Sequence, residues 1–393
     1  MELKTEFNCI DFDNSNCPKG ITSEKITNIK SEEAVFIFTG CWGVYCKTGR
    51  NKRFKLKVPN KEEGKKKDKE KGEKKEKDKE DGEKKENKYE IYGGKDVAQM
   101  MIEYSNKYNI SAVILGGDNI YSDYPSEELL KYIDKIVKNG NLEEIKKLKK
   151  EVKNILYNMD KQFVEGFEKC IRQVKAKDFL VGIGNHDIET CDILNKQLNY
   201  PNWTMLGLYY NYVYSLNDGK NINFVFIDTN IYEDGKMCSG EPYPKNARSM
   251  QFKWLSNVLK ENRSSWNIVI GHVPFIANSH KEGKPTRFSE NLFRDLSMLS
   301  ELIDLYLCAD EHNQQYITYP SLPVEVISGS GGTVLDKNIQ VSEDLIDSTK
   351  YRQANLFGFT ALHISSENIT IKFINKESEN NKFEIYPLLS RIM

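Results

Sequence analysis

Four of the five histidines in this chain stand in short sequences typical of loops. His186 lies in Gly-Asn-His-Asp, His272 in Gly-His-Val-Pro, and His280 and His312 lie beside Ser, Glu and Asn. A single histidine in such a place is commonly a partly buried residue with one hydrogen-bond partner. Four of them near the ends of apolar runs indicate metal chemistry instead. The fifth, His363, lies inside a strand pattern and is expected to be structural.

Carboxylate, amide and phenol side chains accompany these histidines in the same kind of position. Hydrolysis of a phosphate ester at a two-metal site requires a bridging carboxylate, with imidazole and amide ligands on the ions. The motifs Gly-Asp-Asn-x-Tyr, Gly-Asn-His-Asp and Gly-His-x-Pro supply these groups in order, each after a strand-like run. The combination is far more specific than any one of its parts. The candidate ligands are Asp118, Tyr121, Asn185, His272 and His312.

Apolar runs that alternate with helical patterns place these motifs at the ends of strands. Strands are expected at 34–38, 111–115, 179–183, 223–227, 266–270, 305–308, 324–327, 358–364 and 368–374, and helices at 94–108, 159–175, 249–261 and 289–303. Strands alternating with helices predict an α/β sheet. Polar side chains at the carboxyl ends of neighbouring strands meet at one edge of such a sheet, where a site is expected.

One domain, interrupted by two insertions, is expected over residues 34–375. Residues 61–88 contain 13 Lys, 11 Asp or Glu and no apolar residue, so this insertion is expected to be disordered. Residues 126–158 have the Leu, Ile, Lys and Glu periodicity of a helical hairpin inserted over the surface. Residues 1–33 are interpreted as an N-terminal extension and residues 376–393 as a C-terminal tail.

The overall composition argues against nucleic acid as a partner and against a segment that spans a membrane. A net charge of -1 gives no field for nucleic acid, and no apolar stretch approaches the roughly 18 residues that span a bilayer. The N-terminus lacks the apolar stretch of a secretory signal. We therefore expect a cytoplasmic protein, or a secreted or vacuolar one if the N-terminus is incomplete. Eight cysteines without a Cys-x-x-Cys pair are interpreted as reduced thiols.

These motifs give the chain a resemblance to a known family. It resembles the calcineurin-like metallophosphoesterases, and among them the small, tartrate-resistant type of purple acid phosphatase. The resemblance covers about residues 34–375, apart from 50–90 and 126–158, and it implies a four-layer α/β/β/α sandwich with two mixed β-sheets. The likeness to the family extends beyond the ligands themselves and includes residues 227–229, 251–255, 271–275, 304–308 and 328–331.

The resemblance also implies two metal ions and a ligand set for each. Asp118 would bridge the ions. Tyr121 and His312 would bind iron, while Asn185 and His272 would bind a divalent ion such as iron, zinc or manganese.

The implied activity is hydrolysis of small phosphomonoesters. A hydroxide bridging the two ions would attack phosphorus. His186 and His280 would lie near the substrate, where they would hydrogen-bond the phosphate and protonate the leaving group.

Two positions depart from the pattern of the family. Where the first motif of the family has a carboxylate that binds iron, this chain has Cys41, and where the last motif has a histidine that binds the divalent ion, it has Asp310. A thiolate and a carboxylate both bind metal, so one hypothesis is a hydrolase with a retuned site. The other is a catalytically inactive pseudophosphatase that serves as a scaffold for a protein partner.

Overall fold

The computed structural model describes residues 20–43, 49–51, 90–121, 146, 164–232, 235–262, 266–279, 286–377 and 381–387. Contacts divide the chain into one compact unit of residues 1–49, 91–122 and 159–393 and another of residues 50–90 and 123–158. The sheets and helices that carry the candidate site belong to the first unit. The insertion predicted at 61–88 lies outside the described residues, and of the one at 126–158 only Lys146 is described.

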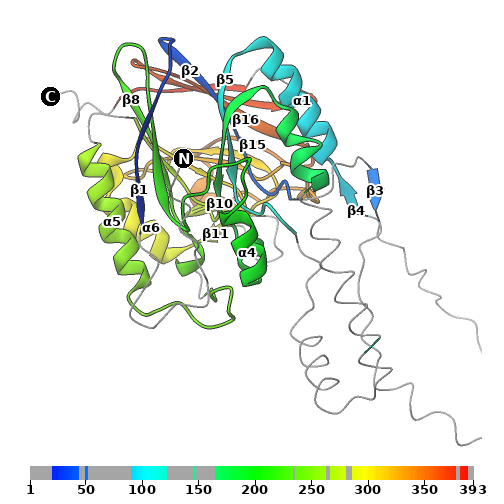
Figure 1. The fold of residues 1–393 in the computed structure, drawn as a ribbon, viewed down its shortest axis with the longest axis horizontal. Helices are drawn as coiled ribbons and strands as arrows, with labels where there is room; N and C mark the ends of the chain where they lie inside the picture. Colours follow the sequence, from blue (N-terminus) through cyan, green and yellow to red (C-terminus); the bar gives the residue numbers. More distant parts are fainter. Residues whose placement is uncertain are drawn as a thin grey trace, which may run out of the picture. The chain divides into compact units, whose positions relative to one another are not determined.

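A six-stranded mixed sheet carries the first motifs of the chain (Figure 1). Its three strands β2, β5 and β6 run parallel, and the others are antiparallel to their neighbours. Val, Ile, Phe and Leu fill these strands because both faces of the parallel part are covered. In spatial order the strands are β18 (Asn381–Ile385), β17 (Ile369–Asn375), β16 (Gly358–Ser365), β2 (Glu33–Thr39), β5 (Ile110–Gly116) and β6 (Ala176–Gly182).

An eight-stranded mixed sheet carries the later motifs. Its central strands β8, β9, β12 and β14 run parallel, so their carboxyl ends share one edge. In spatial order the strands are β1 (Ile21–Asn28), β7 (Tyr210–Ser215), β8 (Asn221–Phe226), β9 (Trp266–Ile270), β12 (Leu305–Cys308), β14 (Val324–Ser328), β13 (Gln314–Ile317) and β15 (Thr349–Gln353). Two short pairs complete the strands: β10 (Ile276–Asn278) with β11 (Thr286–Phe288), and β3 (Gly49–Asn51) with β4 (Glu90–Tyr92).

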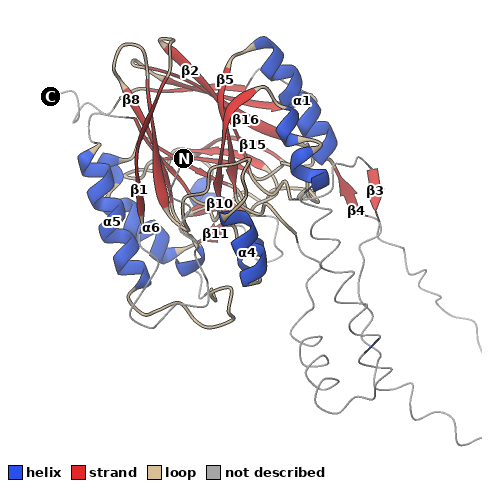
Figure 2. Cartoon of the chain, viewed as in Figure 1, coloured by secondary structure: helices blue, strands red, loops and turns tan. Residues whose placement is uncertain are grey.

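The two sheets pack face to face. The ring of Phe36 on β2 meets Tyr214 on β7 and Phe224 on β8 edge-on, with centroids 5.2 and 4.8 Å apart. All three side chains are completely buried, so they form part of the core between the sheets. Helices lie on the outer sides of both sheets (Figure 2). The predicted four-layer α/β sandwich with two mixed sheets is therefore confirmed.

The helices present the periodic apolar faces that the sequence predicts. On α5 (Ala247–Glu261) the buried residues include Gln251, Leu255, Val258 and Leu259, which follow the spacing of one helix face. Each fully buried leucine of this kind stabilises the fold by about 1.5–3 kcal/mol. The other α-helices are α1 (Gly94–Lys107), α4 (Cys191–Leu198) and α6 (Glu290–Met298). Short helical turns occupy Val164–Glu168, Ile171–Gln173, His186–Ile188, Asn230–Tyr232, Ser300–Leu302 and Glu343–Leu345.

Three sequence predictions about the elements need adjustment. The helix predicted over 159–175 is, where described, a short π-helical segment and a short 3-10 segment joined by a turn. Residues 21–28, placed in an N-terminal extension, form β1 and pair with β7. Residues 381–385, placed in the tail, form β18 and pair with β17. Both edge strands contain alternating exposed and half-buried residues, a weaker signal than the continuous apolar runs of the central strands.

The prediction that the cysteines are reduced thiols is wrong for part of the chain. Cys191 and Cys238, 47 residues apart, form a disulfide that joins the start of α4 to the loop after β8. Cys170 is also disulfide-bonded. Among the described residues, Cys41 and Cys308 are free and buried. Cysteine spacing did not reveal the pairing because the fold brings distant segments together.

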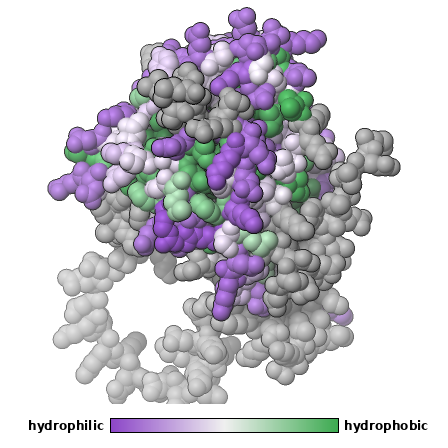
Figure 3. Space-filling view, turned by 90° about the vertical axis from the view of Figure 1, so that its left-hand side faces the viewer, coloured by the Kyte–Doolittle hydropathy of each residue, from purple (hydrophilic) through white to green (hydrophobic). Residues whose placement is uncertain are grey.

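The surface of the described residues is mixed in character. On one face hydrophobic residues emerge between hydrophilic ones (Figure 3). Large exposed apolar side chains include Ile26, Met298 and Ile346. Within the described parts of the chain, every helix is too short or too polar to cross a lipid bilayer.

Candidate functional site

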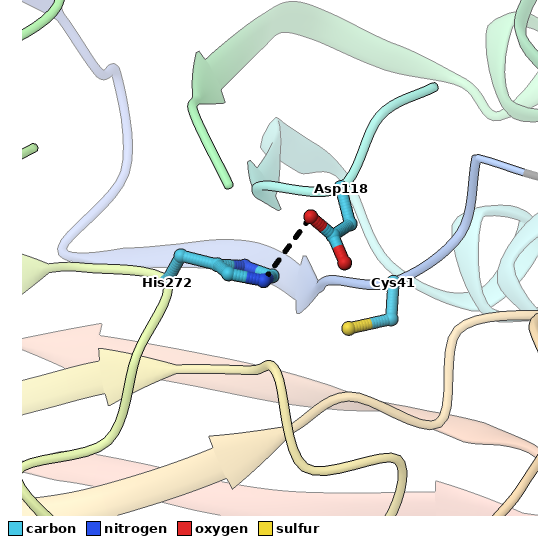
Figure 4. Close-up of side chains that lie close together, drawn as sticks. All are labelled: Cys41, Asp118 and His272. Carbon is cyan, nitrogen blue, oxygen red and sulfur yellow. Dashed lines mark ion pairs between the residues drawn. The ribbon is translucent and has the colours of Figure 1, made fainter. Parts of the chain in front are cut away.

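The candidate residues gather where parallel strands of both sheets end. Cys41 follows β2, Asp118 follows β5 and His272 follows β9, and their side chains converge (Figure 4). The ligand atoms of these three buried residues all lie within 4.8 Å of one another. Polar groups that converge at the carboxyl ends of strands are the usual arrangement of sites in α/β folds.

Left-handed backbone conformations turn several site residues inward. The φ angle is 53° at Cys41, 53° at Asp118 and 59° at Asp310, all outside the usual range for side chains other than glycine. The described residues contain only two further non-glycine examples, Ser321 and Asn355. Such strain costs on the order of 1–3 kcal/mol per residue and clusters at functional sites.

Two glycines allow the loops to approach closely. A Cβ atom at Gly117 would lie 2.6 Å from both Nδ1 of His272 and the backbone nitrogen of Gly184. Gly117 also has a φ of 94°, which disfavours any other residue. A Cβ atom at Gly184 would collide with the carboxylate of Asp118. These glycines are therefore required for the convergence of Asp118 and His272.

The imidazole of His272 is held in one orientation. Its Nδ1 lies 2.9 Å from the carbonyl oxygen of Gly116, which can only accept, so Nδ1 carries the proton. Its Nε2 faces Asp118 Oδ1 at 3.2 Å and Asp310 Oδ1 at 3.6 Å. In the neutral ring this buried Nε2 has no hydrogen-bond partner, whereas a protonated Nε2 would pair with Asp118. A fixed imidazole with an unpartnered nitrogen between carboxylates is the arrangement of a metal ligand.

The electrostatics of the site favour a cation between these groups. Burial would raise the pKa of Asp118, but the neighbouring His272 holds it well below its ordinary value. Burial would lower the pKa of His272, but the carboxylate of Asp118 raises it. Burial and the charge of Asp118 raise the pKa of the Cys41 thiol well above its ordinary value. The pair of Asp118 and His272 thus needs a positive charge, which either a proton or a metal ion can provide.

Tyr121 and His312 lie beside this group. The Tyr121 hydroxyl is 3.4 Å from His312 Nε2, and it interacts with both Cys41 and Asp118. His312 Nδ1 lies 2.7 Å from the carbonyl of Val334, so its Nε2 is the unprotonated nitrogen when the ring is neutral. Burial lowers the pKa of His312 and favours this neutral form. His312 therefore offers a lone pair on the side of Tyr121.

The loop after β6 brings two more candidates to the edge of the site. The backbone N–H of His186 donates to Asp118 Oδ1 at 3.2 Å, and the His186 ring lies 4.6 Å from that of Tyr121. Burial would lower the pKa of His186, but Glu189, 2.6 Å from Nδ1, raises it. Asn185 is exposed next to His186.

The remaining two histidines are not among the residues that the structure places at the site. His280 lies outside the described residues, so its predicted role stays a prediction. His363 lies within β16, where Tyr104 contacts its Nε2 at 2.6 Å and Glu33 contacts its Nδ1 at 3.3 Å. This environment is on another strand from the site residues and agrees with the structural role expected for His363.

Two buried carboxylates escaped the sequence analysis. Asp187 accepts backbone N–H donors from Asn119 and Gly184 at 2.8 Å each and from Ile120 at 3.1 Å. It thereby joins the loop after β5 to the loop after β6. Burial and the charge of Asp118 raise the pKa of Asp187 to about 7.

Asp336 is the second of these carboxylates. Its backbone N–H donates to the carbonyl of His312 at 3.1 Å, and its carboxylate accepts from Asn313 at 2.7 Å. Its charge raises the pKa of Cys41. The motif Gly-Asn-His-Asp could have indicated Asp187, whereas no local pattern marks Asp336.

One protein family and two mammalian proteins are similar to this chain in sequence. The calcineurin-like phosphoesterase family matches residues 90–314. Tartrate-resistant acid phosphatase type 5 of Mus musculus is 24% identical over 237 residues, which are 56% of this chain and 71% of that protein. The Rattus norvegicus protein of the same name matches to the same extent.

Solved structures share the fold at low sequence identity. One is titled GAP50, the anchor in the inner membrane complex of Plasmodium, with a TM-score of 0.57, 16% identity and coverage of 91% of this chain and 89% of that one. Another is a purple acid phosphatase from yellow lupin (Lupinus luteus) seeds, with a TM-score of 0.51, 11% identity and coverage of 92% and 55%.

Proposed function

The chain belongs to the calcineurin-like phosphoesterase family, and on that premise we propose that it hydrolyses phosphomonoesters with metal ions bound where its strands end. The unpartnered Nε2 of His272 carries this proposal. It is completely buried, it lies 3.2 Å from Asp118, and its ring is fixed through Nδ1. Leaving a buried polar atom unsatisfied costs about 1–3 kcal/mol, which a bound cation would offset.

The donor set present in the chain fits metal ions. Asp118 supplies a carboxylate, His272 and His312 supply imidazole nitrogens, and Tyr121 supplies a phenol oxygen. Asn185 adds an amide, and Cys41 and Asp310 add a thiol and a carboxylate at the two altered positions. When bound, metal ions lower the pKa of a water molecule and neutralise charge on a phosphate group.

The residues around this set would orient a phosphate. His186 faces Tyr121, and Glu189 helps to keep its imidazole protonated. Its side chain is 33% exposed, so a phosphate could reach it from solvent. A positive imidazole next to a phosphate oxygen stabilises the added negative charge as phosphorus is attacked. His186 therefore serves the substrate rather than the metal.

The similarity to tartrate-resistant acid phosphatases supports phosphomonoesters as the substrate class. The two mammalian relatives cover little more than half of this chain, so the proposal concerns the class of substrate and not one molecule.

The alternative function is that of an inactive family member that binds a protein partner. Two observations favour it, the thiol at Cys41 and the carboxylate at Asp310 in place of the family ligands. Loss of a single supporting group at a metal site commonly weakens binding about 10- to 100-fold, and two changes compound the effect. The structural likeness to the Plasmodium anchor concerns the fold alone.

Hydrolysis of p-nitrophenyl phosphate by the purified chain tests the proposal. We expect turnover with added iron, zinc or manganese, and a loss of at least about 100-fold in Asp118→Asn because the central carboxylate is removed. The matched control is Asp218→Asn, since Asp218 lies in an exposed turn, where it accepts from the Lys220 backbone. No turnover by the wild type with any of the three ions would contradict the proposal.

A double variant tests the alternative function, that of an inactive family member. Cys41→Asp with Asp310→His restores the ligand types that the family resemblance implies. If the wild type is inactive and this variant hydrolyses the aryl phosphate, the natural chain is a pseudophosphatase on an intact fold. If the wild type is already active, the double variant changes metal preference instead, because a carboxylate suits harder ions than a thiolate.

We also propose that the chain works in an oxidising compartment. The Cys191–Cys238 disulfide supports this location, since disulfides persist in secretory and extracellular spaces and are rare in the cytosol. Mass spectrometry of non-reduced peptides from the natural source would test it. Finding both cysteines as thiols there would overturn the proposal.

A further inference from the structure

We infer that Cys41, Asp118 and His272 bind one thiophilic divalent ion, of the zinc class, between them. This inference deepens the proposed metal-dependent function and rests on it. The family resemblance assigns the residue at position 41 and His272 to two different ions. In this chain the structure brings the thiol, the carboxylate and the imidazole into one compact group.

The distance between Asp118 and His272 matches that of two ligands on a single ion. Zinc binds sulfur at about 2.3 Å and nitrogen or oxygen at about 2.0–2.1 Å, so two ligand atoms of one tetrahedral ion stand about 3.3–3.6 Å apart. Asp118 Oδ1 and His272 Nε2 are 3.2 Å apart. The Cys41 Sγ completes a group in which no pair of ligand atoms exceeds 4.8 Å. Asp310, 3.6 Å from His272 Nε2, is not part of this group.

Backbone hydrogen bonds hold the thiol in position. The N–H of Cys41 donates to the carbonyl of Gly117 at 3.1 Å, and its carbonyl accepts from Thr333 at 3.1 Å. The preceding Gly40 donates to Ser328 at 2.9 Å. Cys41 is therefore anchored to the loops after β5 and β14, with its side chain completely buried. A ligand fixed by its backbone loses little entropy when the ion binds.

The imidazole of His272, on the other side of the group, is also held in one orientation. His272 Nε2 is buried and directed at Asp118, so a proton or a metal ion is needed between the two side chains. A softer thiolate beside one imidazole and one carboxylate selects zinc or cobalt over manganese and magnesium. Three protein ligands also leave a position open for water or substrate, as catalytic zinc sites require.

Cobalt(II) titration of the full chain tests this inference, because cobalt occupies zinc sites and absorbs light when a thiolate binds it. We expect an intense near-ultraviolet charge-transfer band that saturates at one equivalent of cobalt. Cys41→Ser should lose the band and bind cobalt at least about tenfold more weakly. The matched control is Cys308→Ser, since Cys308 is the other free buried cysteine among the described residues and contacts Glu325 instead.

A second variant keeps the test decisive if Cys41→Ser does not fold. Cys41→Asp keeps a ligand at the position and should bind cobalt without the band. A band that persists in either Cys41 variant would overturn the inference. So would cobalt binding to the wild type without a band, or a band that needs two equivalents to saturate.

The cobalt titration and the phosphatase assay test the inference and the proposed function separately. A wild type that shows the band at one equivalent but no phosphatase turnover would contradict only the catalytic proposal. Turnover without the band would contradict only the shared thiolate site. Competition by zinc, which should abolish the band at one equivalent, confirms that both ions occupy the same group.

Discussion

Cys41 and Asp118 follow two adjacent parallel strands and share a left-handed backbone, with φ 53° at each residue. The Cys41 N–H donates to Gly117 next to Asp118, and the Asp118 carbonyl accepts from Gly43 at 3.0 Å. The two loops thus hold each other in place. This pairing fixes the thiol of Cys41 beside the carboxylate of Asp118, where we propose that a metal ion binds.

Cys41→Val should lower the free energy of unfolding by about 1–3 kcal/mol. A β-branched side chain is poorly tolerated at positive φ. The control is Cys308→Val, the same chemical change at a buried cysteine within β12, where β-branched residues are favoured. Urea denaturation of both variants measures the difference. Equal losses would show that the left-handed backbone at Cys41 does not determine the effect.

Asp187→Ala should destabilise the chain by about 3 kcal/mol. It removes the acceptor of three buried backbone N–H groups, from Asn119, Ile120 and Gly184, and leaves them unsatisfied. The same change should weaken metal binding, because the loops after β5 and β6 lose their connection. Denaturation and cobalt titration measure the two effects. A loss below about 1 kcal/mol would mean that water or another group replaces the carboxylate.

Glu325→Gln should stabilise the chain progressively as pH rises above 4.5. Burial raises the pKa of Glu325 well above its ordinary value of 4.5. The folded state therefore keeps the proton while the unfolded state releases it, so this residue opposes folding by about 1.4 kcal/mol per pH unit between the two pKa values. Below pH 4.5 both states are protonated and the difference vanishes.

Urea denaturation at several pH values checks this sign. The stability of the wild type relative to Glu325→Gln should fall from pH 5 to pH 7. Glutamine keeps an oxygen for the N–H of Phe275, which donates to Glu325 at 2.9 Å. Parallel stability profiles for the two proteins would show that Glu325 ionises normally.

Replacing Cys191 and Cys238 together by serine should lower the free energy of unfolding by about 4 kcal/mol, from the entropy of a loop closed across 47 residues. Cys308→Ser serves as the control because it removes a buried thiol but no cross-link. Guanidinium denaturation without reductant measures both. A loss below about 1 kcal/mol would indicate that α4 is held to the loop after β8 by packing alone.

The sequence predicted most of the fold because its central strands are continuous apolar runs. The strand predicted at 266–270 coincides with β9, and the helix predicted at 94–108 matches α1 within one residue. Edge strands β1 and β18 lacked such a run and were assigned to terminal segments. The disulfide between Cys191 and Cys238 depends on which loops meet in space, which local patterns do not encode.

The candidate site was predictable to a similar extent. The motifs identified Asp118 and His272, whose contact at 3.2 Å the structure places at the strand ends. Asp336 was missed because it acts on Cys41 and His312 across the fold and not within a motif. The compact group that includes Cys41 was also missed, since the resemblance assigned its members to separate ions.

The most direct test of the account is the rate of p-nitrophenyl phosphate hydrolysis by the metal-stripped chain before and after zinc, iron or manganese is returned. The proposed function predicts a rate at background after stripping and recovery with at least one ion. Asp118→Asn should remain at background under every condition. A wild-type rate that stays at background with all three ions would contradict the central claim.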